Sequence, residues 1–448
     1  MPRKKIFLET SATVPPRKEN RNDLCSHRTV CRNRRRQEVF GRVCHGRAVR
    51  GEPRVEIRKF GTIRVELEGL RDWLKQQEVT HVVMESTGSY WKPVFNALED
   101  AVKVYLANPQ EVKNRKGHKT DNKDGWWLAH LLRHAMIHPS FIPPRTIREL
   151  RDLTRRRKRL LGAGTSERNR VQKVLEDANV KLGNVLSDLF GVSGQLMLEA
   201  LLQGQAKPEE IAHFAKGRAK KKIPEMIAAL EGHQMSDHHR RMIRYSVDHM
   251  GFLEGQIEQL DQDIVARIRE AGLEPQWQLL QSVPGVQETS AAEILAETGT
   301  DMTQFPSEKH ISSWAGICPG NNRSAGRNKS SHTTGGNRWL RGTLTECAWA
   351  ASAKKNGFIK DKFRRIITKS GGKKPPAVVA IAHTLLILIY QALLTGQPYQ
   401  DKRAPVLDQR QKQRLIRHHI RRLGKLGVAV CSARPGSSAT AAKTPTGT

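Results

Sequence analysis

An alternation of strand and helix patterns between residues 54 and 108 restricts the fold more than any other part of the sequence. Short β-branched segments such as "VTHVVMES" and "VKVYLANP" have the length and composition of buried strands. Segments with helical spacing of apolar residues, such as "IRVELEGLRDWLKQQ", lie between them. Because strands that alternate with helices form a mixed or parallel sheet, the pattern predicts an α/β domain over residues 51–140. In such sheets, sites form beyond the strand ends.

Three acidic residues of this domain are candidates for a shared site. Glu85 ends one predicted strand, and Asp121 and Asp124 lie three residues apart in the first turn of a predicted helix, so both aspartates can point at one spot. Carboxylates from separate elements suit a hard divalent cation such as Mg²⁺. The alternative is structural, with Asp121 capping the helix and Asp124 a solvated acid of its first turn.

Residues 145–270 are expected to form long helices. In the last of these, apolar residues recur every seven positions or fill the other seam positions: Ile243, Met250, Ile257, Ile264, Leu253 and Leu260. This heptad spacing predicts a coiled coil, either antiparallel or between chains, and therefore an oligomer. An ordinary helical hairpin within one chain is the alternative.

Residues 275–398 have the pattern of a mostly helical domain. It begins with "LLQSVPGVQETSAAEILAETG", a Pro-Gly turn between two short helical segments, as in a helix-hairpin-helix, where N–H groups around Gly285 can contact a phosphate. A loop rich in Gly, Ser, Asn and Arg follows, from Trp314 to Arg341. The apolar run from Ala377 to Leu394 is interrupted by polar residues, so we expect a buried core helix and not a membrane span.

The chain carries a large excess of positive charge. Its 77 Lys and Arg outnumber 44 Asp and Glu, which gives a net charge of +33 over 448 residues. Such a surface attracts polyanions, nucleic acid above all. The six cysteines show neither metal-binding nor disulfide spacing, and we recognise no signal peptide. We expect a reduced, cytoplasmic protein without a zinc site, which binds nucleic acid and no membrane.

Several motifs occur together and in order. "MESTGSYWKPVFNAL", "KTDNKD" and "SVPGV…WAGICPG…RSAG…GGNRWLR" closely resemble the DEDD insertion-sequence transposases, the family of the bridge-RNA-guided recombinases. The resemblance runs from about Arg54 to Pro398. It implies a ribonuclease-H-like α/β amino-terminal domain, similar to Holliday-junction resolvases, then a helical coiled-coil linker and a mostly α transposase domain with a helix-hairpin-helix.

The resemblance also assigns roles to residues. The family's Mg²⁺-binding Glu corresponds to Glu85, and its DxxD pair corresponds to Asp121 and Asp124. Its nucleophilic serine corresponds to Ser324, which would attack a phosphodiester and form a phosphoserine. Without the family, that serine would be interpreted as a turn residue. The predicted nucleic-acid contacts are Lys119, Gly285, Arg323, Arg327, Lys329, Arg338 and Arg341.

The function implied by the resemblance is an Mg²⁺-dependent DNA transposase or recombinase. It would be guided by a bridge RNA, act on element ends and target DNA as a dimer or tetramer, and associate with the nucleoid. Two alternatives remain open. A metal-dependent nuclease or junction resolvase would hydrolyse DNA with water and ignore Ser324. A non-enzymatic nucleic-acid-binding protein would use its charge alone.

Both ends of the chain depart from this pattern. The family's first Asp lies on its first strand, but the corresponding place reads "CRNRRRQEVFGRVC" and contains no Asp. With suitable codons, the same DNA read one base later gives Ala-Gly-Ile-Asp-Val-Gly-Lys-Lys-Phe-Leu-Val-Val-Cys, a family-like first strand. We therefore predict that residues 1–50 are frameshifted or disordered, with the normal frame resuming near Gly51, and that this chain is inactive. Residues 399–448 are predicted to be a basic, disordered tail.

Overall fold

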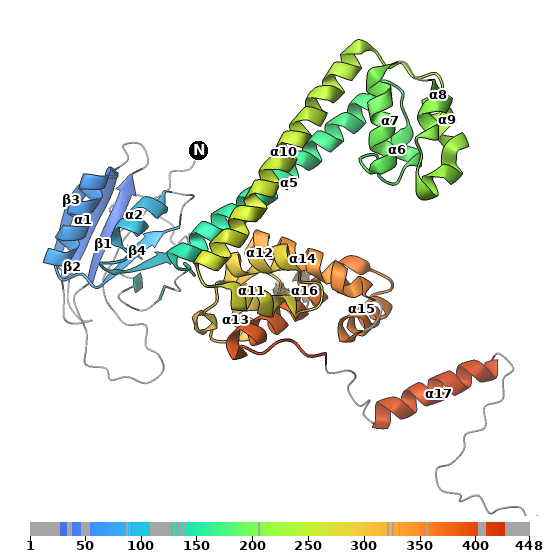
Figure 1. Ribbon diagram of the computed structural model, residues 1–448. Helices are drawn as coiled ribbons and strands as arrows, with labels where there is room; N and C mark the ends of the chain where they lie inside the picture. The colour runs from blue at the N-terminus through green and yellow to red at the C-terminus, as the bar shows by residue number, and fades with distance from the viewer. Residues whose placement is uncertain are drawn as a thin grey trace, which may run out of the picture. The chain divides into compact units, whose positions relative to one another are not determined.

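The structure of the protein is a computed structural model (Figure 1). The chain divides into two compact units, Met1–Pro143 and Pro144–Thr448. The residues that the structure describes are 27–33, 38–45, 54–86, 88, 90–107, 127–128, 131–132, 134, 136–137, 140–204, 207–319, 322–324, 327–330, 332–354, 357–401 and 409–425.

The first unit contains two small sheets. Its strands are β1 (His27–Asn33), β2 (Glu38–His45), β3 (Arg54–Gly61), β4 (His81–Glu85) and β5 (Lys103–Ala107). The first three strands form an antiparallel sheet in the order β1-β2-β3, whereas β4 and β5 pair in parallel, with Glu85 opposite Ala107. β1 packs beside β4. The carboxyl ends of β4 and β5 therefore lie together at one edge.

The pair β4–β5 has a hydrophobic core on each face. Val82 and Met84 pack in a core with α1 (Arg64–Gln76) and α2 (Trp91–Leu98), which lie beside the strands in Figure 1. Val83 points to the other face, into a core whose members include Leu128, Leu131 and Leu132. Successive residues of a strand point to opposite faces, so a continuous apolar run such as "HVVME" requires cover on both. The unit is the α/β arrangement that the sequence pattern predicts.

Strands β1 and β2 lie inside the range 1–50, which the sequence predicted to be frameshifted or disordered. The structure differs from that expectation, since it pairs the two strands over their full length, from His27 opposite Cys44 to Asn33 opposite Glu38. Segments with Val30 and Val39 have the β-branched residues that favour strands. A backbone pairing does not test the reading frame, which stays a prediction.

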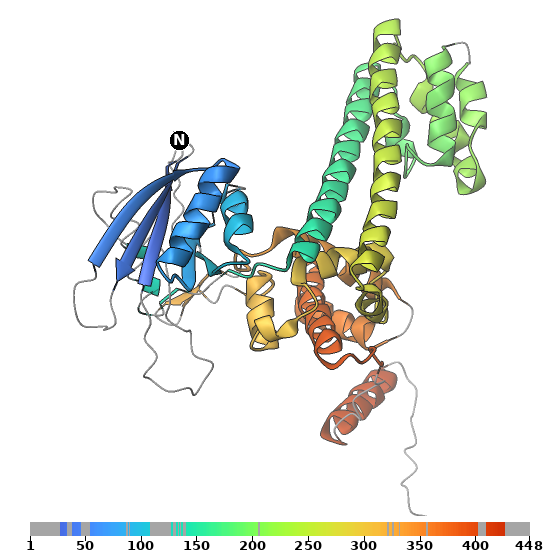
Figure 2. The same cartoon turned by 60° about the vertical axis from the view of Figure 1, so that its left-hand side comes forward.

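Two long helices dominate the second unit. α5 (Arg145–Asp177) and α10 (Asp237–Glu270) lie side by side in both ribbon views (Figures 1 and 2). Arg157 pairs with Asp261, and Arg168, further along α5, pairs with Glu254, which is earlier in α10, so the helices are antiparallel. The predicted seam residues Ile243, Met250, Leu253 and Ile264 are buried in this chain, and Ile257 and Leu260 are half-buried.

The seam therefore forms a helical hairpin within one chain, which is the alternative that the heptads left open. Whether further chains associate with it stays a prediction. The connection between the two helices is a small helical cap with its own core, which also takes in the ends of α5 and α10. Its elements are α6 (Leu182–Val185), α7 (Val192–Gln203), α8 (Pro208–His213), a 3₁₀ turn (Gly217–Lys222) and α9 (Ile223–Leu230).

The rest of the second unit is a helical domain built around an apolar helix. Its elements are α11 (Glu274–Gln281), α12 (Glu288–Thr298), a 3₁₀ turn (Met302–Gln304), α13 (Glu308–Trp314), β6 (Asn322–Ser324), β7 (Arg327–Ser330), α14 (Arg338–Ala353), α15 (Phe358–Lys369) and α16 (Lys374–Thr395). α16 is long and apolar enough to cross a membrane by composition. It packs instead against α11, α13, α14 and α15, which is the buried core helix that the sequence predicted.

A last helix, α17 (Gln409–Lys425), falls within the range 399–448 that was predicted to be disordered. The structure differs from the prediction here as well. Gln, Lys, Arg and Leu are strong helix formers, and no proline interrupts this stretch. The basic composition of this stretch suggested disorder, but its helix-forming residues, with no proline among them, allow a helix.

Candidate serine hairpin and nucleic-acid interface

Ser324 lies on a short antiparallel hairpin between α13 and α14. It is the last residue of β6, and it pairs with Arg327, the first residue of β7. Two backbone hydrogen bonds close the base of the hairpin: Thr334 N–H donates to the Cys318 carbonyl at 3.2 Å, and Asn337 N–H donates to the Trp314 carbonyl at 3.3 Å. The hairpin therefore projects from a closed stem.

Two glycines allow this stem to close. A Cβ on Gly336 would lie 2.3 Å from the backbone nitrogen of Gly316, and a Cβ on Gly316 would lie 2.8 Å from the nitrogen of Gly336. Gly316 also has φ +70°, in the left-handed region that only glycine adopts without cost. The two backbones thus touch where any side chain would separate them, and the motifs "WAGICPG" and "GGNRWLR" meet at this point.

We expect Gly336→Ala to destabilise the stem, whereas Gly335→Ala will be tolerated. The alanine methyl at 336 would overlap the backbone of Gly316, and overpacking of this kind costs roughly 1–3 kcal/mol. At Gly335 an added Cβ would meet nothing within 4 Å. Thermal unfolding and amide exchange of residues 314–340 in the two variants test this. An equal loss in both would contradict the packing argument.

The carboxylate of Glu297, on α12, fixes the point where the stem joins α14. Asn337 caps α14, since its side-chain oxygen accepts the N–H groups of Trp339 and Leu340. Its side-chain NH₂ donates to Glu297 Oε2 at 2.6 Å. The Glu297 side chain is only 3% exposed. A buried acid therefore holds the residue that ends the serine loop.

Cations from α5 balance the buried acids of α12. Arg155 makes a bidentate pair with Glu297, at 2.7 and 2.8 Å. Arg151 donates to the carbonyls of Ala296 and Glu297, which satisfies the carboxyl end of α12. Burial lowers the pKa of Arg151 to about 10 against the opposing pull of Glu297, so the guanidinium stays charged at neutral pH.

One turn further along α5, the same pattern repeats. Lys158 contacts Glu293 Oε2 at 2.9 Å and donates to Thr343 Oγ1 at 2.7 Å, and the Thr343 hydroxyl lies 2.7 Å from the same carboxylate oxygen. Cations at positions i, i+4 and i+7 of α5 thus face acids at i and i+4 of α12. These contacts fix α5 to α12 and to α14, the helix that follows the serine hairpin.

Trp339, at the start of α14, lies among three guanidinium groups. The Cζ atoms of Arg155, Arg159 and Arg338 are 5.6, 5.7 and 4.9 Å from its ring centroid. Beside it lies an open groove of about 920 Å³, formed by α5, the start of α12 and the start of α14. Arg159, Arg338 and Arg341 are exposed. Cations interleaved with an aromatic ring next to a groove suit a nucleic-acid backbone.

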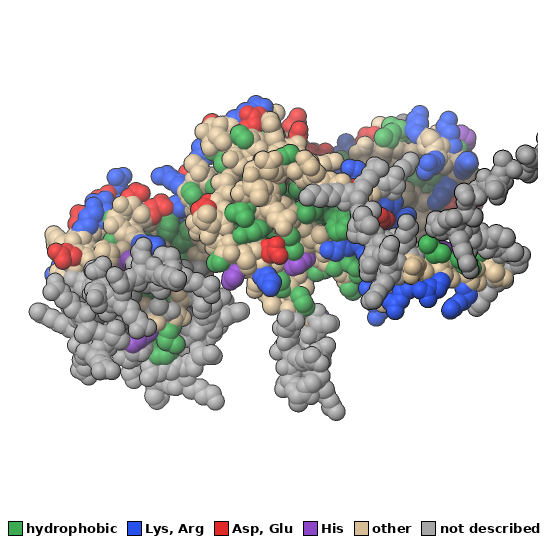
Figure 3. All heavy atoms as spheres, turned by 90° about the horizontal axis from the view of Figure 1, so that it is seen from below, with side chains coloured by type: hydrophobic (Ala, Val, Ile, Leu, Met, Phe, Trp, Pro, Cys, Tyr) green, Lys and Arg blue, Asp and Glu red, His purple; other side chains and the backbone are tan. Residues whose placement is uncertain are grey.

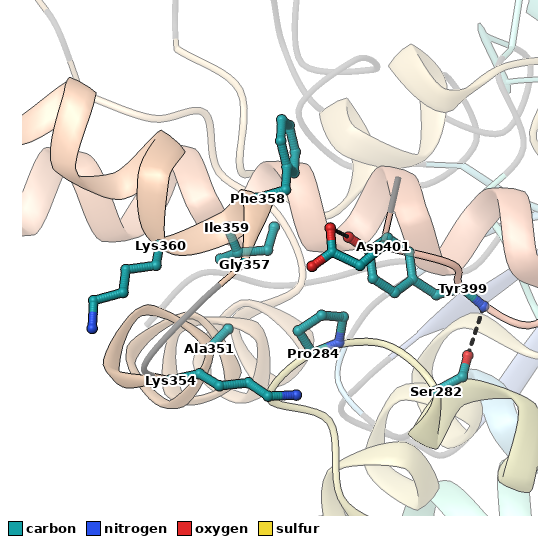
Figure 4. A pocket seen from close by; sticks show the side chains of 10 residues that line it. All are labelled: Ser282, Pro284, Ala351, Lys354, Gly357, Phe358, Ile359, Lys360, Tyr399 and Asp401. Carbon is teal, nitrogen blue, oxygen red and sulfur yellow. Dashed lines mark hydrogen bonds between the residues drawn. The ribbon is translucent and has the colours of Figure 1, made fainter. Parts of the chain in front are cut away.

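The segment after α16 returns to the helix-hairpin-helix turn. Tyr399 N–H donates to Ser282 Oγ at 2.9 Å (Figure 4). Around this contact lies a small pocket of about 210 Å³, with Pro284, Asp401 and Lys354 in its wall. Burial, together with the nearby Asp401 carboxylate, raises the pKa of the Tyr399 hydroxyl. The chain that leads to α17 is thereby anchored at the turn.

In the first unit, Glu85 is the last residue of β4 and is half-buried. β1, which packs beside β4, contains no acidic residue. Asp121 and Asp124 lie outside the described residues. Among the residues that are described, no group of three or more His, Cys, Asp or Glu could hold a metal ion. An all-carboxylate donor set does fit the chemistry of Mg²⁺.

Comparison with protein families agrees with this arrangement. A model of DEDD transposases of the IS110 type, described as Transposase, matches residues 49–180, and the model Transposase IS116/IS110/IS902 family matches residues 277–364. The chain belongs to the IS110-type DEDD transposases. No curated protein matches the chain. The first match begins at residue 49, after β1 and β2.

The structure describes some of the predicted site residues of the transposase and not others. Glu85 stands at a strand end as predicted. Arg323, Arg327 and Lys329 share the hairpin with Ser324, although the structure describes only their backbone. Lys119 lies outside the described residues.

Gly285 has a packing role that the sequence did not reveal. A Cβ there would lie 2.3 Å from the carbonyl oxygen of Cys347 on α14, and its φ is +81°. The turn must therefore be glycine for α14 to pack against it, and its contact with a phosphate stays a prediction.

Four residues of the transposase were missed by sequence reasoning. They connect α5, α12 and the base of the serine hairpin, and they are Glu297, Asn337, Arg155 and Trp339. A signal was present in "AAEILAETG", where acids four residues apart interrupt an apolar helix. Acids are rarely buried unless they are paired, so this segment implied cationic partners.

Proposed function

We propose that the chain is a transposase that cuts and exchanges DNA strands through Ser324, with Mg²⁺ held by Glu85, Asp121 and Asp124. A bridge RNA would select the DNA, and two or four chains would act together. The first unit would have the ribonuclease-H-like fold of its family. The observation that carries the proposal is the serine hairpin, held on a closed stem at the amino end of α14.

The location of the hairpin supports a nucleophilic role. A short hairpin on a fixed stem can enter a DNA groove or reach a phosphate, whereas its base stays bound through Asn337 to Glu297. Basic residues flank Ser324 on both strands of the hairpin, and Arg338 and Arg341 follow on α14. Such cations would hold the phosphate that the serine attacks.

The reaction proposed is a transesterification. The Ser324 Oγ forms a bond to phosphorus, the bond from phosphorus to a deoxyribose oxygen breaks, and the serine proton ends on that leaving oxygen. A deoxyribose hydroxyl of another strand reverses the step and frees the serine. The phosphodiester is exchanged for a phosphoserine ester and is not hydrolysed, so strands can be rejoined without a further energy source.

Mg²⁺ at the three carboxylates would supply positive charge for the oxygens of the scissile phosphate. The residues that would hold it are Glu85, at the end of β4, and Asp121 and Asp124. Acids in a basic DNA-binding protein need such an explanation, because without a cation they repel phosphates.

A metal-dependent nuclease is the second candidate function. It is favoured by the carboxylates of the first unit, which alone suffice for hydrolysis with water. A protein that only binds nucleic acid is the third, favoured by the net charge of +33 and by the absence of an acid in β1.

Replacing Ser324 distinguishes these functions. In a chain whose first strand has been restored, we expect Ser324→Ala to abolish the covalent protein–DNA adduct and recombination. Ser330→Ala, on the other strand of the same hairpin, is the matched control and should form the adduct normally. Denaturing gel electrophoresis with labelled DNA measures the adduct. Cleavage without any adduct would support the nuclease, and an adduct in the Ser324→Ala variant would refute the assignment.

A further inference from the structure

The helix α17 has an ordered distribution of charge that the proposed function does not use. Its 17 residues include seven Lys and Arg and no Asp or Glu. The described side chains between Gln413 and Gly424 are all exposed. Figure 3 shows Lys and Arg side chains gathered on the surface at the right of the picture. The helix is therefore a solvent-facing cationic element.

The basic residues of α17 form a stripe. Arg414, Arg417 and Arg421 are spaced i, i+3 and i+7, which places them on one face of a helix with 3.6 residues per turn. Positions 410 and 425 continue the same spacing with basic residues. Ile416 and Ile420 lie about a third of a turn away, on a neighbouring face. We call Arg414, Arg417 and Arg421 the basic stripe.

A helix of this kind needs an anionic partner. Like charges at i, i+3 and i, i+4 destabilise a helix, and most helical stability in proteins comes from packing against other elements. Binding a polyanion along the basic stripe would turn this repulsion into attraction. The charge pattern thus selects a ligand with a row of negative charges.

Duplex DNA fits the stripe better than other polyanions. An α-helix with its side chains is ~10–12 Å wide, close to the ~12 Å width of the major groove of B-form DNA. The corresponding groove of duplex RNA is deep and too narrow for side chains to read. The chain also belongs to a family of DNA transposases.

The attachment of α17 keeps it close to the helix-hairpin-helix turn. Tyr399 is bound to Ser282 at that turn, and residues 402–408 between Asp401 and α17 can span at most ~30 Å. A DNA duplex bound at the turn or in the groove beside Trp339 would lie within reach of α17. The two contacts would then act on one DNA molecule.

We propose that α17 binds the phosphate backbone of duplex DNA through the basic stripe, independently of sequence. The inference rests on the DNA-binding part of the proposed function and does not depend on Ser324. It assigns to α17 a share of the affinity for DNA and none of the chemistry.

A pair of double variants of the full chain tests the proposal. Arg417→Gln/Arg421→Gln removes two charges from the stripe, and Lys412→Gln/Arg422→Gln removes two charges from other faces of the same helix. Binding to a short DNA duplex of mixed sequence is measured over a range of salt concentrations. The stripe variant should lower the magnitude of the slope of log affinity against log salt by ~1.8 and weaken binding ~30-fold at 0.15 M salt, because each phosphate contact contributes about 0.9 to the slope. The control pair should keep most of the slope.

Equal losses in the two double variants would overturn the proposal, because net charge alone would then explain the binding. It would also be overturned if the stripe variant bound DNA normally but lost binding to an RNA hairpin, or to vesicles of phosphatidylcholine and phosphatidylserine. The Ser324 adduct assay is separate. A normal adduct with unchanged DNA affinity in the stripe variant would reject the role of α17 and leave the proposed function standing.

Discussion

Replacing Glu297 with alanine is expected to destabilise the second unit by about 3–5 kcal/mol, the cost of breaking a buried ion pair by removing one partner. Arg155 would lose both of its hydrogen bonds to the carboxylate, and Asn337 would lose the acceptor that holds it. Since domains are stable by only ~5–15 kcal/mol, the loss would be a large share of the total. Amide exchange of α12 and α14, followed by mass spectrometry, measures it locally.

Glu288→Ala is the control for this prediction. Glu288 lies on the same helix but is exposed, so its removal should change stability by less than ~0.5 kcal/mol. A second variant, Glu297→Gln, keeps the shape and the bond to Asn337 while it removes the charge that Arg155 requires. It should fall between the other two. If Glu297→Ala were as stable as the wild type, the network would not hold the stem as described.

The sequence predicted the parts of the fold whose pattern is long and regular. The heptads located α10 and its seam, and the interrupted apolar run located α16 in the core. The continuous run "HVVME" located a strand buried on both faces, with Glu85 at its end. In each case the pattern of apolar residues within one segment is enough, because the buried face of a helix or strand determines which of its own positions are apolar.

Features that depend on two distant segments escaped the sequence. The heptads of α10 could not show whether α5 or another chain covers them, since both provide apolar residues. The bond between Glu297 and Asn337 joins residues 40 positions apart, and the contact of Gly316 with Gly336 depends on how the loop closes. The candidate site residues were predicted where motifs resemble a family, whereas the residues that support the serine hairpin were not predicted.

The charge of the first strand leads to the prediction with the largest effect. β1 pairs with β2 and packs beside β4, yet its sequence includes Arg28 and Arg32. Buried arginines without partners are strongly unfavourable. The reading shifted by one base would replace Cys31, Arg32 and Asn33 with Ala, Gly and Ile and put an aspartate at the position of Arg34, directly after β1.

That aspartate would follow the strand that packs beside β4, the strand that Glu85 ends. The shifted reading would thus remove Arg32 from β1 and supply a fourth carboxylate in one change. The family match that begins at residue 49 agrees with a change of frame before that point. Sequencing the DNA over residues 31–48 is the direct check, and a shifted reading without this strand would exclude the idea.

We therefore expect the chain as it stands to show no recombination and a weakly stable region before about residue 140, and the frame-restored chain to show Mg²⁺-dependent recombination. Each buried backbone group left unpaired around a faulty strand costs ~1–3 kcal/mol, which a domain of ordinary stability cannot sustain at several positions. A restored chain whose new aspartate is replaced by alanine separates the two defects. It should recover folding, measured by thermal unfolding of the first unit, but not recombination. Robust recombination by the unrestored chain would show that neither the strand nor its carboxylate is needed.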